Sequence, residues 1–128
     1  MAETNTATTV EFELVSPQKL VVSEPVEMVV VPGAEGDLGV LPGHSPLIAE
    51  VRPGVIDIHE GGKVDERIFI AGGFCEISAE RCTVLAEEAM PVGEIDKAAA
   101  EERLKAANEN DNDAERRIAE AMVAAASS

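Results

Sequence analysis

The fold is decided by a run of alternating residues, VEFEL, at positions 10–14. Val10, Phe12 and Leu14 would share one face of a strand and the glutamates between them the other, because successive side chains of a strand point to opposite faces. The same alternation recurs in short runs as far as about residue 90, with Gly and Pro turns between them. The runs lie at 10–14, 20–22, 26–30, 47–51, 55–59, 67–70, 74–78 and 82–85. Roughly nine short strands with frequent turns predict a β-sandwich or a barrel.

The turns between these runs are specified by Pro and Gly. Three Pro-Gly dipeptides occur, at 32–33, 42–43 and 53–54, where Pro fixes φ and Gly accepts a positive φ. The densest segment is PGAEGDLGVLPGHSPL, residues 32–47, with four glycines and three prolines. Its composition predicts a single long loop with a defined path, and such loops often carry function on a rigid scaffold.

The sequence changes character after Met90 and Pro91. From Glu94 onward Ala, Glu, Lys and Arg dominate, all good helix formers, so we expect a β domain over 1–90 and a helical domain over 91–128. The first helix would run over 94–107 and the second over 113–126, with a polar turn at 108–113 between them. Helices this short are marginal alone in water, so the hairpin should depend on docking.

The second helix of this hairpin has a predicted start and a predicted contact face. Asn112 and Glu115 have the spacing of a capping box. A narrow apolar stripe follows, made of Ala114, Ile118, Ala121, Met122 and Ala125.

Charge and composition exclude several classes of function. The formal net charge is −15, with 10 basic against 25 acidic residues, which argues against a nucleic-acid-binding surface and favours a neutral or basic protein partner. The apolar run at 28–31 is too short to span a bilayer, and the polar start MAETNTATT predicts no export signal, so a soluble chain is expected. With three aromatic residues, the core must be aliphatic.

No residue pattern predicts catalysis, a bound metal or a cofactor. His44 and His59 have no nearby partner at metal-ligand spacing, and Ser45 has no G-x-S-x-G context. Cys75 and Cys82 lie outside any C-x-x-C motif and are interpreted as small core residues. A metal-dependent β-sandwich enzyme that uses the two histidines is kept as an alternative, which metal analysis of the purified chain would test.

Several segments together resemble a known family. The stretch at 32–47, RPGVI at 52–56 and FIAGGFCEI at 69–77 resemble the epsilon subunits of F-type ATP synthases, called delta in mitochondria. FELVSP at 12–17 and TVLAEEA at 83–89 extend the resemblance over nearly the whole chain. It implies a flattened β-sandwich of about ten strands followed by a C-terminal α-helical hairpin.

The resemblance also implies a function. The chain would be a non-catalytic rotor subunit that couples proton-driven rotation of the c-ring to ATP synthesis in the catalytic head, with no cofactor of its own. Its partners would be the gamma subunit and the c-ring, with the alpha and beta subunits of the head as further candidates. It would be a peripheral membrane protein on the cytoplasmic side of a bacterial inner membrane.

Contact residues follow from the resemblance position by position. The ring-facing loop would include Glu35, Asp37 and His44; the alternative is that Asp37 caps its turn and His44 makes an internal hydrogen bond. For the gamma subunit we expect an apolar patch with Val29 and Val31, since a permanent interface is more hydrophobic than ordinary surface. The alternative for these valines is a central strand covered on both faces.

The tail departs from the family pattern. Relatives use the hairpin to inhibit ATP hydrolysis, but the end of the second helix carries no basic residue here, and only Arg116 and Arg117 remain as inhibitory contacts. Relatives that bind ATP carry a motif resembling IDxxRA. Here Ile95 and Asp96 are followed by Ala99 and Ala100, so the arginine is missing. We expect weak or absent inhibition and feeble ATP binding, with a working brake or nucleotide sensor as the alternative.

Overall fold

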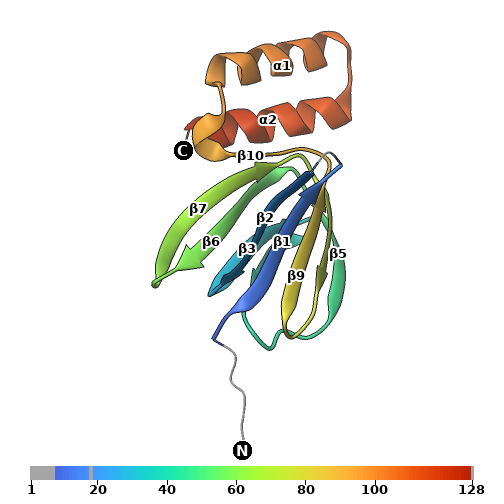
Figure 1. Cartoon of the computed structure of the whole chain (residues 1–128). Helices are drawn as coiled ribbons and strands as arrows, with labels where there is room; N and C mark the ends of the chain where they lie inside the picture. Colours follow the sequence, from blue (N-terminus) through green and yellow to red (C-terminus); the bar gives the residue numbers. More distant parts are fainter. Residues whose placement is uncertain (1–7, 18, 128) are drawn as a thin grey trace, which may run out of the picture.

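The computed structural model describes residues 8–17 and 19–127. The strands are β1 (Val10–Ser16), β2 (Lys19–Val26), β3 (Met28–Gly33), β4 (Gly36–Val40), β5 (Leu47–Val51), β6 (Gly54–Glu60), β7 (Lys63–Ile70), β8 (Gly73–Ile77), β9 (Arg81–Ala86) and β10 (Ala89–Pro91). A 3-10 turn, η1 (Val92–Glu94), leads to the helices α1 (Lys97–Glu109) and α2 (Asp113–Ser127). The predicted class, a β-sandwich followed by a helical hairpin, is confirmed (Figure 1). The predicted division at about residue 91 falls where β10 gives way to η1, and it stays a prediction.

The strands form one sheet that folds over on itself. Their order is β10-β7-β6-β3-β5-β8-β9-β1-β2, with β4 paired to the side of β3. Within the described residues a single pair, Gly33 opposite Val51, joins β3 to β5. One layer is therefore β10, β7, β6, β3 and β4, and the other is β5, β8, β9, β1 and β2. Most pairs are antiparallel, but β1 and β9 run parallel.

The alternation in the sequence places the core as predicted. Val10, Phe12 and Leu14 of β1 are fully buried between the layers. Facing strands contribute Ile56 and Ile58 from one layer, and similar aliphatic residues from the other, to the same cluster. The sandwich interior is thus built from one face of each strand, because burying that face removes a continuous apolar surface from water.

Two strands were missed in the sequence. The segment predicted as one long loop contains β4, a five-residue strand that pairs with β3 from Val40 opposite Val29 to Gly36 opposite Gly33. Glycines at 36 and 39 hid its alternation, since glycine weakens a strand signal. The three-residue β10 was also missed, because it is too short to show a period.

The helices begin and end at residues that differ slightly from the prediction. Val92–Glu94 forms a 3-10 turn and Ile95 is extended, so α1 starts after Asp96, whose side chain accepts a hydrogen bond from Ala99 N at 3.2 Å. Asn112 caps α2 as predicted, accepting from Glu115 N at 3.1 Å. The Glu115 side chain does not complete a capping box, because it binds Arg103 instead.

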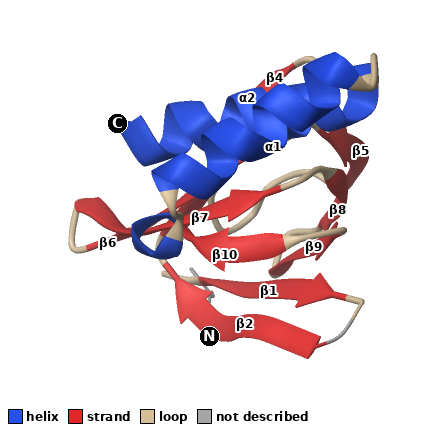
Figure 2. Ribbon diagram, turned by 90° about the horizontal axis from the view of Figure 1, so that it is seen from above, coloured by secondary structure: helices blue, strands red, loops and turns tan. Residues whose placement is uncertain are grey.

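The hairpin docks on one end of the sandwich (Figures 1 and 2). The register places Met90, Phe69 and Val55 side by side across β10, β7 and β6. This row packs against the apolar side of the hairpin, including Ala100 and Met122. The rest of the same cluster is Ala71, Val92, Ile95, Ile118, Ala121, Val123 and Ala125. Docking is therefore the tertiary support that helices of this length require.

Candidate interaction surfaces

The residues predicted to form one ring-facing loop lie at opposite ends of β4. Glu35 occupies the turn between β3 and β4, next to Ala34, which lines a pocket together with Ala114 and Arg117 of α2. His44 lies in the connection after β4, where Gly43 N donates to Ala79 O at 2.7 Å in the turn between β8 and β9. A five-residue strand extends about 17 Å, so β4 places Glu35 and Asp37 near one of its ends and His44 beyond the other.

Asp37 and His44 each have a partner within the chain. Arg52 donates to Asp37 Oδ1 at 2.7 Å through Nη2 and to Gly33 O at 2.5 Å through Nη1. Asp37 therefore fixes the β3–β4 turn through an ion pair, and does not cap it. The His44 ring lies with Nδ1 2.6 Å from Ser45 O, which is the internal hydrogen bond considered as the alternative. Contact of Glu35, Asp37 or His44 with a c-ring stays a prediction.

The apolar patch predicted at Val29 and Val31 is wrong. Both side chains are fully buried in the sandwich core, because they lie on the inner face of β3 and join the cluster between the layers. The opposite face of β3 carries Met28 and Val30, which are half-buried. An interface that used Val29 or Val31 would require the sandwich to open.

The exposed apolar surface lies on the other layer. Ile48, Phe74 and Leu85 are 72%, 57% and 55% exposed. They come from the adjacent strands β5, β8 and β9, where Phe74 lies opposite Leu85 in the register. Val15 of β1 lies opposite Leu85 on the next strand and extends the patch. We name Val15, Ile48, Phe74 and Leu85 the outer patch.

The alternation already carried the signal for the outer patch. In β8, Cys75 and Ile77 face the core, so Phe74 must face outward, and Val84 likewise turns Leu85 out. A large aromatic residue that is exposed among apolar neighbours is unusual for a free surface. Such a patch is typical of a protein–protein contact.

A second cluster joins the hairpin to the sandwich through charge. Arg103 of α1 donates to both carboxylate oxygens of Glu88, at 3.0 and 3.1 Å, from Nη1 and Nη2. Its Nε donates to Glu115 of α2. The hydrogen bonds to Glu115 and then Glu88 raise the pKa of Arg103 above its usual range. One guanidinium thus ties α1, α2 and the segment before β10 together, and no local sequence pattern predicts this cluster.

The predicted tail residues have ordinary structural positions. Asp96 caps α1, and Ile95 packs against the docking cluster. Ala100 is buried within that cluster, while Ala99 is exposed. The retained positions of the degenerate motif are therefore explained by capping and packing.

Of the two arginines of α2, Arg116 is engaged locally. It pairs with Asp113, three residues earlier on the same helix. Arg117 is exposed and lines a groove with Arg52 and Pro53 of the sandwich. Both arginines lie near the start of α2, far from its C-terminal end.

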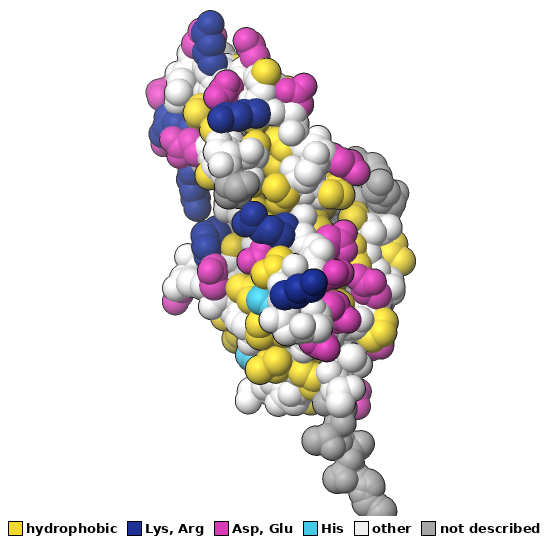
Figure 3. Space-filling view, turned by 90° about the vertical axis from the view of Figure 1, so that its left-hand side faces the viewer, with side chains coloured by type: hydrophobic (Ala, Val, Ile, Leu, Met, Phe, Trp, Pro, Cys, Tyr) yellow, Lys and Arg dark blue, Asp and Glu magenta, His cyan; other side chains and the backbone are white. Residues whose placement is uncertain are grey.

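Figure 3 shows the distribution of charge on one side of the molecule. Acidic and basic side chains both occur on the hairpin at the top and on the sandwich below it, and hydrophobic side chains show where the two parts meet and again lower on the sandwich. Over residues 8–17 and 19–127, no group of three or more potential ligands could hold a metal ion. In the same residues, no helix has the length and hydropathy needed to cross a bilayer.

Cys75 and Cys82 are buried as predicted. Burial of the thiol raises the pKa of Cys82 to about 12, and the neighbouring Cys75 adds to the rise. Burial also raises the pKa of Cys75, against a hydrogen bond with the Ala49 backbone that lowers it. Only the thiolate is a strong nucleophile, so both thiols should be inert in the folded chain.

We therefore expect neither cysteine to react with an aromatic disulfide reagent at pH 8 unless the chain is unfolded. With its pKa near 12, Cys82 is a thiolate in roughly one molecule in ten thousand at that pH. The absorbance of the released thiol, followed with and without concentrated urea, measures this. Labelling of the native chain as fast as in urea would contradict the buried positions and would support a redox role.

Comparison with known proteins gives a consistent result. Residues 9–92 match the model for the β-sandwich domain of the ATP synthase delta/epsilon chain. An ATP synthase epsilon chain of Paramagnetospirillum magneticum is 64% identical over 105 residues, covering 82% of this chain and 79% of that protein. The epsilon chain of Rhodospirillum rubrum is 57% identical over 103 residues, covering 80% and 77%.

Two solved structures share the fold. A chain of the Euglena gracilis mitochondrial ATP synthase, in a structure with OSCP, F1 and the c-ring, has a TM-score of 0.75 at 24% identity, covering 95% of this chain and 79% of that one. A chain of the Tetrahymena thermophila mitochondrial ATP synthase central stalk and c-ring has a TM-score of 0.59 at 16% identity, covering 93% and 99%. At these identities the likeness is one of fold.

Proposed function

This chain belongs to the ATP synthase delta/epsilon family, and we infer from that premise that it works as the epsilon subunit in the central stalk of an F-type ATP synthase. It is an accessory subunit, and the catalytic sites of the complex lie on other subunits. Its role is to link the rotation of the c-ring to ATP synthesis in the head. As a rotor part it is associated with the membrane through the complex, and we place it on the cytoplasmic side of a bacterial inner membrane.

The observation that carries this proposal is the outer patch. A rotor subunit must transmit torque through a permanent interface, and permanent interfaces are more hydrophobic than ordinary surface. Phe74 and Leu85 offer adjacent exposed apolar side chains on a rigid sheet, of the kind that forms the centre of an interface. We assign this patch, in place of Val29 and Val31, to the gamma subunit.

The outer patch can be tested with Phe74→Glu. A carboxylate at the centre of an apolar interface must be desolvated on binding, so we expect the affinity for purified gamma subunit to fall about tenfold or more. Isothermal titration of the full chain measures this. Val64→Glu is the matched control. Like Phe74, Val64 is an exposed apolar residue on a strand, with 44% of it accessible, but it belongs to β7 in the other layer. If both variants bind the gamma subunit as tightly as the unmodified chain does, the outer patch is not part of the interface.

A second candidate function is regulation by the hairpin. The Arg103 cluster and the apolar docking cluster favour a hairpin that stays docked on the sandwich. A docked hairpin cannot reach the catalytic head. Since Arg116 is paired within its helix, we keep weak or absent inhibition of ATP hydrolysis as the expectation. ATP hydrolysis by a catalytic complex stripped of this subunit tests the regulatory function, when the complex is titrated with the full chain and, separately, with a chain ending at Met90. If only the full chain inhibits hydrolysis, the hairpin is an inhibitor.

A further inference from the structure

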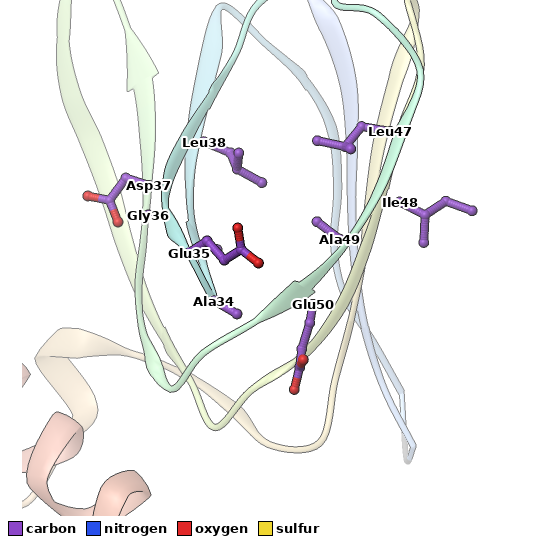
Figure 4. Close-up of a pocket in the computed structure, with 10 residues that line it drawn as sticks. Ala34, Glu35, Gly36, Asp37, Leu38, Leu47, Ile48, Ala49 and Glu50 are labelled. Carbon is purple, nitrogen blue, oxygen red and sulfur yellow. The ribbon is translucent and has the colours of Figure 1, made fainter.

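The sandwich is open along one side, between β4 and β5. These strands are consecutive in the chain but do not pair with each other. A cavity of about 470 Å³ lies between them, lined by residues 33–38 and 47–50. Figure 4 shows Leu38 and Ala49 from opposite strands turned toward the gap and the Glu35 carboxylate also reaching into it, while Ile48 and Asp37 point away from it. We name this gap the β4–β5 seam.

Backbone groups at the seam have no strand to pair with in the described chain. Arg52 N donates to Pro32 O at 2.9 Å, so the Pro32 carbonyl points away from β4. Pro32 lies opposite Asp37, so Asp37 also turns its N–H and C=O away from β3, and Gly39 does the same two residues later. The same reasoning applies to β5, where Glu50 O accepts from Ala34 N and the backbone of Ile48 therefore faces the gap.

Other edges of the sheet are protected, but this one is not. The edge strand β2 carries Glu24 and Pro25 and pairs with β1 through an irregular register, and β10 is three residues long and ends in Pro91. By contrast, β4 carries two glycines. A Cβ at Gly39 would meet nothing within 4 Å, and its φ is not positive, so the chain itself does not require glycine there. Glycine within a strand often marks the close approach of another backbone.

We propose that an extended segment of the gamma subunit inserts into the β4–β5 seam and pairs with the free backbone of β4, completing the sheet. This rests on the proposed function. The occupant follows from continuity with the outer patch, because the backbone of Ile48 faces the seam while its side chain lines the pocket beside Phe74 on the outer face. A partner on the outer patch is thus already at the mouth of the seam. The segment should be apolar where it meets Leu38 and Leu47, with a basic residue near Glu35 and Glu50.

Amide hydrogen exchange of the full chain, free and bound to purified gamma subunit, tests the pairing. Strand pairing should slow exchange at Asp37 and Gly39 by about 100-fold in the complex, because a new hydrogen bond must open before exchange. The Gly39→Pro variant removes one outward N–H that none of the described strands uses, and we expect its affinity for gamma to fall about tenfold.

A second pair of variants covers the case in which Gly39→Pro does not fold. Leu47 is 38% exposed at the seam, so Leu47→Glu should also weaken binding about tenfold, while Val64→Glu should not. If Phe74→Glu weakens binding but the Asp37 and Gly39 amides exchange equally fast in both states, the seam is not used and the proposed function still stands. Protection that appears without gamma at high concentration would assign the seam to a second copy of this chain and overturn the proposal. If gamma does not bind at all, the proposed function itself fails.

Discussion

We expect the Gly73→Ala variant to be unable to keep the native fold. A Cβ at Gly73 would lie 1.9 Å from Leu85 O and 3.1 Å from Ala86 Cα, on the neighbouring strand β9. Both contacts are with backbone, so no side chain can move aside. The φ of Gly73 is +146°, which adds strain for any other residue. Overpacking and backbone strain together should cost about 4 kcal/mol or more, which is a large part of the stability of a domain this size.

Urea unfolding followed by circular dichroism measures this effect. Gly93→Ala is the matched control, because Gly93 has no positive φ and a Cβ there would meet nothing within 4 Å. The control should stay within about 0.5 kcal/mol of the unmodified chain. A Gly73→Ala variant as stable as the control would mean that β8 and β9 are not packed as described. The same geometry explains the second glycine of FIAGGF as a requirement of strand packing.

The second large effect is expected at Arg103. Replacing it with alanine removes the bidentate bond to Glu88 and the bond to Glu115, and leaves two carboxylates facing each other between the hairpin and the sandwich. The partners are partly exposed, with 38% and 34% of each side chain accessible, so the loss is smaller than for a fully buried pair. We expect the docked state to lose about 2 kcal/mol, or roughly thirtyfold in its equilibrium with the released state.

Hydrogen exchange of α1 and limited proteolysis in the turn between the helices report this release. The sandwich should keep its own unfolding transition, since its core lies in a separate cluster. Arg116→Ala is the control, because Arg116 pairs with Asp113 within α2 and should affect the helix alone. Equal protection of α1 in both variants would show that the apolar docking cluster holds the hairpin without Arg103.

Much of the fold could be predicted because it depends on local periodicity. The alternation in β1 predicted its three core residues, and the alternation in β8 and β9 predicted that Cys75 and Cys82 face the core. The helical tail and its Asn112 cap followed from helix-forming residues and capping chemistry. The strand β4 escaped because its glycines erase the alternation on which the prediction depends.

The exposure and placement of the predicted contact residues could not be read from the sequence, for a different reason. A period of two says that Val29 and Val30 face opposite ways, but it does not say which of the two faces is covered. Glu35, Asp37 and His44 are close in sequence, yet the missed strand β4 carries the chain to the opposite end of the sandwich between them.

The sequence by itself determined the class of fold, the inner face of most strands, the family and the buried positions of the two cysteines, because each depends on residues within a few positions of one another. Only the tertiary structure decided which apolar residues stay exposed, where the sheet remains open and how the hairpin is held. The outer patch needs four strands in register. The seam needs two strands that do not pair, and the Arg103 cluster joins Glu88 and Glu115 from segments 27 residues apart. These contacts arise between distant parts of the chain, and no local pattern encodes them.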